Sequence, residues 1–270
     1  MKAFLVLFLS FCLSLPLQAQ NSGLRRLTDR EDLLGWEAVG KLELGGGSYC
    51  TGTLIAKDLV LTAAHCAVSK STGKRLEPGQ ITFKAGYSDG RALAEQDVIQ
   101  IAVPENFQIN GPNGADRIRV DVALLRLAAP IPLDVADPFA LHSGNIHGAE
   151  ISVSSYGQGR DEAISRQRSC RILNRDEGMI VVDCDVTFGS SGSALLARSG
   201  SRWQILSVLS AGAVHNGQKI GFGMELPEIV AQLKRQLYRD APRPKAGIKM
   251  LGVGSGRSSS GAKFIRPNGS

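Results

Sequence analysis

The chain has 270 residues, 43% of them hydrophobic, and a formal net charge of +6. Residues 241–270 alone carry six Lys or Arg and no Asp or Glu, so the rest of the chain is close to neutral. The charge therefore excludes a polyanion-binding surface spread over the folded body. That body, roughly residues 20–240, has a length that fits one all-β domain or two small barrels.

Residues 1–19 have the layout of a cleavable secretory signal: Lys2, an apolar run, and the small residue Ala19 before polar sequence. The apolar run is shorter than the roughly 20 residues that a membrane-spanning helix needs. We therefore expect an exported protein, secreted or periplasmic, without a membrane span. Residues 20–35 are interpreted as an N-terminal segment, part of which could be removed as a short propeptide.

Short runs rich in β-branched and apolar residues fill most of the body, separated by clusters of Gly, Pro, Asn and Asp. Such a pattern is typical of β-barrels or sandwiches. The expected strands are 41–44, 51–56, 59–64, 81–86, 97–103, 121–127, 150–157, 169–173, 179–186, 193–197 and 203–212.

One segment near the end of the body predicts a helix. From Leu226, apolar residues recur at i, i+3, i+4, i+7 and i+11, and Pro227 is tolerated in the first turn. The helix should pack one stripe onto the body and end near Asp240. Residues 241–270 are rich in Gly, Ser and Pro and are predicted to be disordered. This basic segment is either a solvated end of the chain or a weak tether to a surface or polyanion.

The cysteines favour two disulfides. Cys12 is removed with the signal, and an even number in an exported chain favours disulfides over free thiols or zinc. No C-x-x-C spacing supports a zinc site, and no metal or cofactor is expected. Each remaining cysteine has one near neighbour, which predicts the pairs Cys50 with Cys66 and Cys170 with Cys184.

A histidine and an aspartate stand at positions suited to catalysis. "LTAAHC" places His65 at the end of an apolar strand beside Cys66, whose disulfide would fix its backbone as a catalytic base requires. Asp121 opens the apolar run "DVALLRL", where a buried carboxylate needs a partner such as an imidazolium. The alternatives are an ordinary hydrogen-bonded histidine and a turn-capping aspartate, although Asp116 fits that capping role better.

The stretch "GSSGSA", residues 189–194, offers three serine hydroxyls. By composition it is a turn. With His65 and Asp121 upstream, its G-x-S-G pattern makes Ser191 the expected nucleophile, with the amides of Gly189 and Ser191 as an oxyanion hole. The chain order His, Asp, Ser is that of chymotrypsin, and Ser193 breaks the G-x-S-x-G elbow of the α/β-hydrolases.

The chain resembles the trypsin-like (chymotrypsin-fold) serine proteases over most of residues 36–240. The resemblance rests on "CTGTLIAKDLVLTAAHC", "DVALLRL", "SSYGQG" and "GSSGSAL", which occur in the family's order. It implies an all-β fold of two six-stranded antiparallel β-barrels with a C-terminal helix. It also implies a monomeric endopeptidase that acts on polypeptides through an acyl-enzyme, without nucleic acid. His65 would be the general base, Asp121 the orienting acid and Ser191 the nucleophile, while Ser210 would line the cleft and support the aspartate.

Two departures from the digestive members of this family indicate a different activation. Those enzymes have an aspartate before the nucleophile that receives a new N-terminal amine, and here that position is Ser190. The N-terminus also lacks their "IVGG" type of sequence. The combination resembles the bacterial branch that includes glutamyl endopeptidases, so activity should not depend on burying an amine.

The residue preference at the cleavage site is left open by the sequence. Asp185 stands where trypsin has the acid at the base of its pocket, but Thr187 replaces a bracing cysteine. Leu209 stands where glutamyl endopeptidases have a histidine. Asp185, Ser210 and Gly212 are the pocket candidates. The alternative to an enzyme is a catalytically silent binding protein with the protease fold, which an intact His-Asp-Ser set disfavours.

Overall fold

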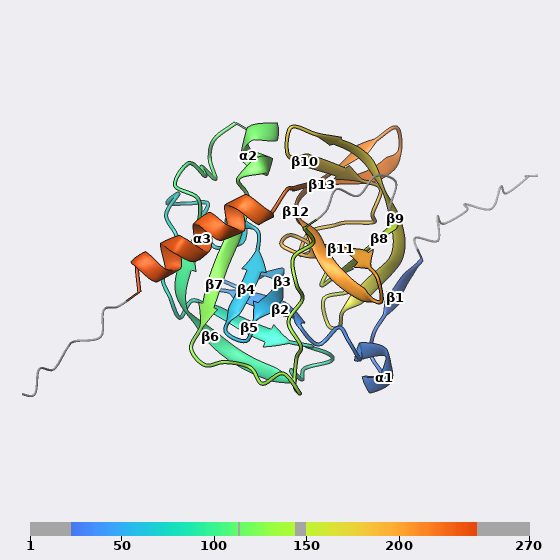
Figure 1. Cartoon of the computed structure of the whole chain (residues 1–270), viewed down its shortest axis with the longest axis horizontal. Helices are drawn as coiled ribbons and strands as arrows, with labels where there is room; N and C mark the ends of the chain where they lie inside the picture. Colours follow the sequence, from blue (N-terminus) through green and yellow to red (C-terminus); the bar gives the residue numbers. More distant parts are fainter. Residues whose placement is uncertain (1–22, 113, 144–149, 242–270) are drawn as a thin grey trace, which may run out of the picture. The chain divides into compact units, whose positions relative to one another are not determined.

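The computed structural model describes residues 23–112, 114–143 and 150–241 (Figure 1). The predicted signal peptide, 1–19, and residues 242–270 of the predicted tail lie outside these ranges. The described residues up to Asp240 form one compact unit.

The first half of this unit is a closed six-stranded antiparallel barrel. Its strands follow one another in the order β2-β3-β4-β7-β6-β5. Alternate side chains of β5 point inward, as the period of a strand requires. The bounds are β2 (Val39–Leu44), β3 (Ser48–Ala56), β4 (Leu59–Thr62), β5 (Ile81–Ala85), β6 (Ala94–Ala102) and β7 (Ala123–Leu127). Fully buried side chains fill the interior, including Leu42, Leu54, Leu61, Phe83, Leu124 and Leu125.

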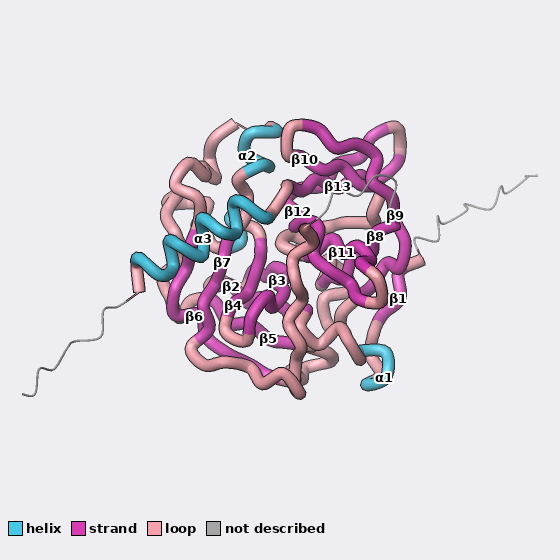
Figure 2. Tube along the Cα trace, viewed as in Figure 1, coloured by secondary structure: helices cyan, strands magenta, loops and turns pink. Residues whose placement is uncertain are grey.

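The second half is also a six-stranded antiparallel barrel. Its strands follow the order β9-β10-β13-β12-β11-β8, and a pairing of β8 with β9 closes the ring. The two groups of strands can be followed in Figure 2. The bounds are β8 (Glu150–Ser155), β9 (Ser165–Asp176), β10 (Met179–Val182), β11 (Ala194–Ser199), β12 (Arg202–His215) and β13 (Gln218–Met224). The all-β architecture of two six-stranded barrels is therefore confirmed.

Within the described ranges, three α-helices accompany the barrels: α1 (Arg30–Leu33), α2 (Ala115–Arg119) and α3 (Pro227–Arg239). The predicted C-terminal helix is confirmed as α3, which packs on β6 and β7. Its buried stripe is Val230, Leu233 and Leu237, and Gln100 Nε2 donates a hydrogen bond to the Leu237 carbonyl at 2.9 Å. Among the described residues, no helix is long and apolar enough to cross a bilayer.

Residues 23–35, the described part of the N-terminal segment, belong to the folded unit. Strand β1 (Leu24–Arg26) pairs with β9, with Leu24 opposite Gln167. Leu27 is buried, and its N–H donates to the Ile164 carbonyl at 2.8 Å. The fold therefore begins before residue 36, where the sequence placed the start of the domain. A strand of three residues is too short to show an alternating pattern.

Both disulfides join the cysteines that the sequence paired. Cys50 bonds to Cys66 and Cys170 to Cys184, with Cα–Cα distances of 6.2 and 5.2 Å. The second bridge ties β9 to the segment that follows β10 and leads to Ser191.

Removing either bridge by double substitution to serine should lower the free energy of unfolding by about 3 kcal/mol, because it frees a closed loop in the unfolded chain. Urea denaturation of the double variants Cys50→Ser/Cys66→Ser and Cys170→Ser/Cys184→Ser, against the unaltered protein, measures this loss. Peptide mapping that joined Cys50 to Cys170 or Cys184 would contradict the pairing.

Candidate active site

Two clefts meet at His65 and Ser191, which line both of them together with Phe188. Phe188 is 81% exposed. The first cleft is further lined by Leu44, Tyr49, Cys50, Cys66, Val68 and Gly189. The second cleft is further lined by Val186, Leu209, Ser210, Gly212, Val214 and Lys219. An extended chain lying across both clefts would therefore pass His65 and Ser191.

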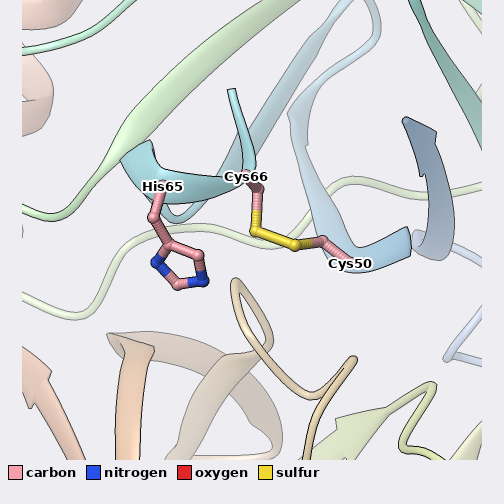
Figure 3. A group of neighbouring side chains, drawn as sticks. All are labelled: Cys50, His65 and Cys66. Atoms are coloured by element: carbon pink, nitrogen blue, oxygen red, sulfur yellow. A yellow bond between two sulfur atoms is a disulfide. The ribbon is translucent and has the colours of Figure 1, made fainter. Parts of the chain in front are cut away.

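His65 lies on a short 3₁₀ turn, Ala64–Cys66, that follows β4. Figure 3 shows His65 and Cys66 on this turn and the disulfide that ties the turn to Cys50 on β3. The nitrogen of His65 and the two sulfurs lie within 4.8 Å of one another. Both sulfurs belong to the disulfide, so the group has no thiolate to offer a metal ion. The bridge fixes the backbone that carries the imidazole.

Asp121 is 2% exposed and lies two residues before the start of β7. Its Oδ1 accepts the backbone N–H of His65 at 2.8 Å, and its Oδ2 lies 2.7 Å from His65 Nδ1. Ser210 Oγ donates to the same Oδ2 at 2.5 Å. Three donors thus compensate the burial of the carboxylate. The bond to Nδ1 holds the tautomer in which Nε2 can accept a proton.

Asp116, the weaker aspartate candidate, is outside this group. Its side chain is fully exposed and bonds to Arg119 on the same helix at 2.7 Å. Of the two aspartates, the one that the sequence favoured as the orienting acid, Asp121, is thus buried, and Asp116 is exposed.

The backbone from Thr187 to Ser193 forms two consecutive turns. Ser190 N–H donates to the Thr187 carbonyl at 3.0 Å, and Ser193 N–H donates to the Ser190 carbonyl at 3.1 Å. Gly189 and Gly192 occupy the third positions with φ of +81° and +80°, as in type II turns. A Cβ would lie 2.3 Å from the Tyr49 ring at the first glycine and 2.1 Å from Thr62 Oγ1 at the second. Both positions therefore require glycine.

Hydrogen bonds on the far side of this loop set the direction of its amides. The Phe188 carbonyl accepts from Gln158 N–H at 2.7 Å, and the Gly189 and Ser191 carbonyls accept from Thr51 Oγ1 and N–H, each at 2.9 Å. C=O and N–H point in opposite directions across a trans peptide, so the Gly189 N–H faces away from Gln158. In the described part of the chain, neither the Gly189 nor the Ser191 N–H has an acceptor. Two free donors thus flank the Ser191 hydroxyl.

Of the three pocket candidates, Ser210 and Gly212 line the second cleft and Asp185 does not. The Asp185 carboxylate instead lies 2.6 Å from Lys219 Nζ. This differs from the prediction because Lys219 on β13 neutralises the acid, and no local pattern places that lysine near it. A Cβ on Gly212 would lie 3.0 Å from Val186 Cγ2, which shows how closely Val186 approaches this strand.

Thr51 and Arg160 hold the Ser191 loop and were not identified from the sequence. Thr51 is fully buried and also donates its Oγ1 to the Gly189 carbonyl. Arg160 contacts Ser190. Both residues lie beside sequence features that carried the resemblance: Thr51 follows Cys50, and Arg160 follows the motif "SSYGQG".

Comparison with known proteins gives the family and the fold. A family model described as a trypsin-like peptidase domain matches residues 50–202. Serine protease 23 of Bos taurus is 28% identical over 198 residues, 65% of this chain and 50% of that protein. The CLIP domain-containing serine protease HP8 of Bombyx mori is 30% identical over 209 residues, 63% of this chain and 56% of that protein. The chain thus spans about half the length of these curated relatives.

Two solved structures share the fold. A Glu endopeptidase in complex with MPD superposes with a TM-score of 0.66 at 21% identity, covering 79% of this chain and 96% of that one. The protease Anisep from Arthrobacter nicotinovorans gives a TM-score of 0.59 at 20% identity, covering 74% and 94%. The likeness predicted from the four ordered motifs is confirmed by a family model that covers more than half of the chain. The chain belongs to the family of trypsin-like peptidase domains.

Proposed function

We propose that this protein is an exported serine endopeptidase in which Ser191 is the nucleophile, His65 the general base and Asp121 the orienting acid. The observation that carries the proposal is the bonding of Asp121 to the backbone and ring of His65, at 2.8 and 2.7 Å, in clefts that also contain Ser191. Export is supported by two disulfides, which persist in oxidising compartments.

The reaction begins when Ser191 Oγ attacks the carbonyl carbon of the scissile peptide and His65 Nε2 takes the hydroxyl proton. The carbonyl oxygen becomes an oxyanion, and the free N–H groups of Gly189 and Ser191 are the donors that would stabilise it. The C–N bond then breaks, His65 gives its proton to the leaving amine, and an acyl ester stays on Ser191. Water then attacks the ester carbonyl while His65 takes its proton; the acyl C–Oγ bond breaks, the acid leaves, and His65 returns the proton to Ser191 Oγ. Asp121 stabilises the imidazolium in both steps.

The alternative, a protease-fold binding protein without turnover, would have no need for this bonding. A buried carboxylate with three donors stabilises a cation beside it. A binding surface forms no such cation, so it does not require this carboxylate. Hydrolysis of a peptide library followed by mass spectrometry separates the two, because only the enzyme produces new termini.

The same library should show cleavage after small uncharged residues, with sites after Lys or Arg cut at least tenfold more slowly. Asp185 is already paired with Lys219, and the Val186 side chain approaches Gly212 in the second cleft. Val186→Ala should extend cleavage to longer apolar residues, since each methylene in such a pocket changes the rate by roughly 10- to 200-fold.

Ile99→Ala is the control for this variant, since Ile99 is an exposed apolar residue of β6 that lines neither cleft. It should leave the cleavage profile unchanged. A dominant preference for Lys or Arg that Val186→Ala does not alter would overturn the assignment of the pocket.

A further inference from the structure

Ser190, the residue before the nucleophile, lies in a buried polar cluster. It is 0% exposed, and its Oγ lies 3.1 Å from Ser155 Oγ and 3.4 Å from Arg160 Nη2. The same Oγ accepts from the Thr187 N–H at 3.4 Å. This hydroxyl therefore bonds both to its own turn and to a neighbouring segment.

The Arg160 guanidinium joins three parts of the second barrel. Nη1 donates to the carbonyl and the hydroxyl of Ser155, at 3.3 and 3.2 Å, at the end of β8. Nη2 donates to the Asp185 carbonyl and to Ser190 Oγ, each at 3.4 Å. It thus bonds to the Ser191 loop at Ser190 and to the segment that leads into the loop at Asp185. A Cβ on Gly157 would lie 2.6 Å from Arg160 Cζ, so the guanidinium packs directly against this glycine.

This guanidinium is half-buried without a direct carboxylate partner. Among the described residues, no carboxylate oxygen lies within 4.0 Å of it, and the nearby Asp185 carboxylate bonds to Lys219 instead. Burial lowers the pKa of Arg160, and the field of Asp185 opposes that change. A buried charge without a counter-ion costs stability, and neutral oxygens offset this cost only in part. Its bond to Ser190 connects it to the turns that contain Gly189 and Ser191.

We infer that Arg160 is the positioning residue of this site: through Ser190 it holds the 187–191 loop in the conformation that presents the Gly189 and Ser191 amides. It takes the place that an N-terminal amine and an aspartate fill in the digestive enzymes that the sequence departs from. Arg160 can act in this way only if Ser191 is the nucleophile, so the inference rests on the proposed function. Its loss should weaken binding of the transition state more than binding of substrate.

Arg160→Met tests this by removing the charge while keeping much of the side-chain length. With a peptide ester cleaved by the unaltered protein, kcat should fall 10- to 100-fold and KM should change less than threefold. Inhibition by a peptide boronic acid, which forms a tetrahedral adduct, should weaken by the same factor as kcat. Arg160→Lys keeps the charge and should recover kcat to within about fivefold of the unaltered protein.

Arg166→Met is the matched control, because Arg166 is also a half-buried arginine of the second barrel. Its guanidinium lies 3.8 Å from the centre of the Trp36 ring, and its Nε donates to Ser152 Oγ at 3.0 Å, with no bond to the Ser191 loop. This variant should lower the melting temperature and leave kcat within twofold. If both methionine variants lower kcat in proportion to their lost stability, the role of Arg160 is merely structural and the inference is wrong.

Ser190→Asp, made both with Arg160 present and in the Arg160→Met background, supplies a second test. The new carboxylate would face the guanidinium, so this variant should keep at least a third of the activity. In the Arg160→Met background the same substitution should lower kcat at least tenfold further, because the carboxylate is then buried alone.

Equal effects of Ser190→Asp in the two backgrounds would overturn the inference, as would an Arg160→Met protein that is folded and fully active. These outcomes leave the proposed function intact. That function fails separately if the unaltered protein hydrolyses no peptide or ester.

Discussion

Ser191→Ala should reduce peptide hydrolysis by roughly 10⁴- to 10⁶-fold while the melting temperature stays within about 2 °C. The hydroxyl is the atom that forms the acyl ester in the proposed reaction. In the described part of the chain it makes no hydrogen bond that folding would lose, and the residue is only partly buried. Initial rates on a cleaved library peptide, with thermal denaturation of the same samples, measure both quantities.

Ser193→Ala is the matched control for that loss, because Ser193 lies two residues away in the same loop. Its hydroxyl is buried and has no hydrogen-bond partner among the residues that the structure describes, so its removal should leave activity within about threefold. If Ser193→Ala were inactive and Ser191→Ala active, the assignment of the nucleophile would be wrong.

Asp121→Asn should lower kcat by about 10³- to 10⁴-fold at neutral pH with little change in fold. Oδ2 faces two donors, His65 Nδ1–H and the Ser210 hydroxyl, and Oδ1 faces the His65 backbone N–H. An amide NH₂ at either position would meet a donor. The ring would then adopt the tautomer with its proton on Nε2, which cannot accept the proton of Ser191.

Asp116→Asn controls for the charge change, because this exposed carboxylate bonds only to Arg119 within the described structure. It should leave kcat unchanged. Ser210→Ala should have a smaller effect than Asp121→Asn, since it removes one donor and leaves the carboxylate in place. An Asp121→Asn protein that kept a tenth or more of kcat would contradict the orienting role.

The sequence predicted the parts of the molecule that depend on local pattern. Short runs rich in β-branched and apolar residues, separated by Gly, Pro, Asn and Asp, indicated the barrel strands. The i, i+3, i+4, i+7 spacing of apolar residues indicated α3, because a helix that packs one face has apolar residues at that period. Cys50 with Cys66 and Cys170 with Cys184 could be paired because each pair is close along the chain.

Contacts between distant residues could not be predicted in the same way. Lys219 lies 34 residues from Asp185, and Ser190 lies 30 residues from Arg160, so no periodicity connects them. Strand β1 exists because β9 offers it a free edge, a property of the folded barrel. The pocket and the support of the Ser191 loop are therefore visible only in three dimensions.

Labelling with a fluorophosphonate probe, followed by peptide mapping, tests most directly whether Ser191 is an activated nucleophile. The probe forms a bond with a serine Oγ whose proton a neighbouring base can take. The predicted result is one adduct per chain, located on Ser191, absent after denaturation and absent from His65→Ala. A folded protein that takes no label, or one labelled at Ser190 or Ser193, would contradict the proposed endopeptidase.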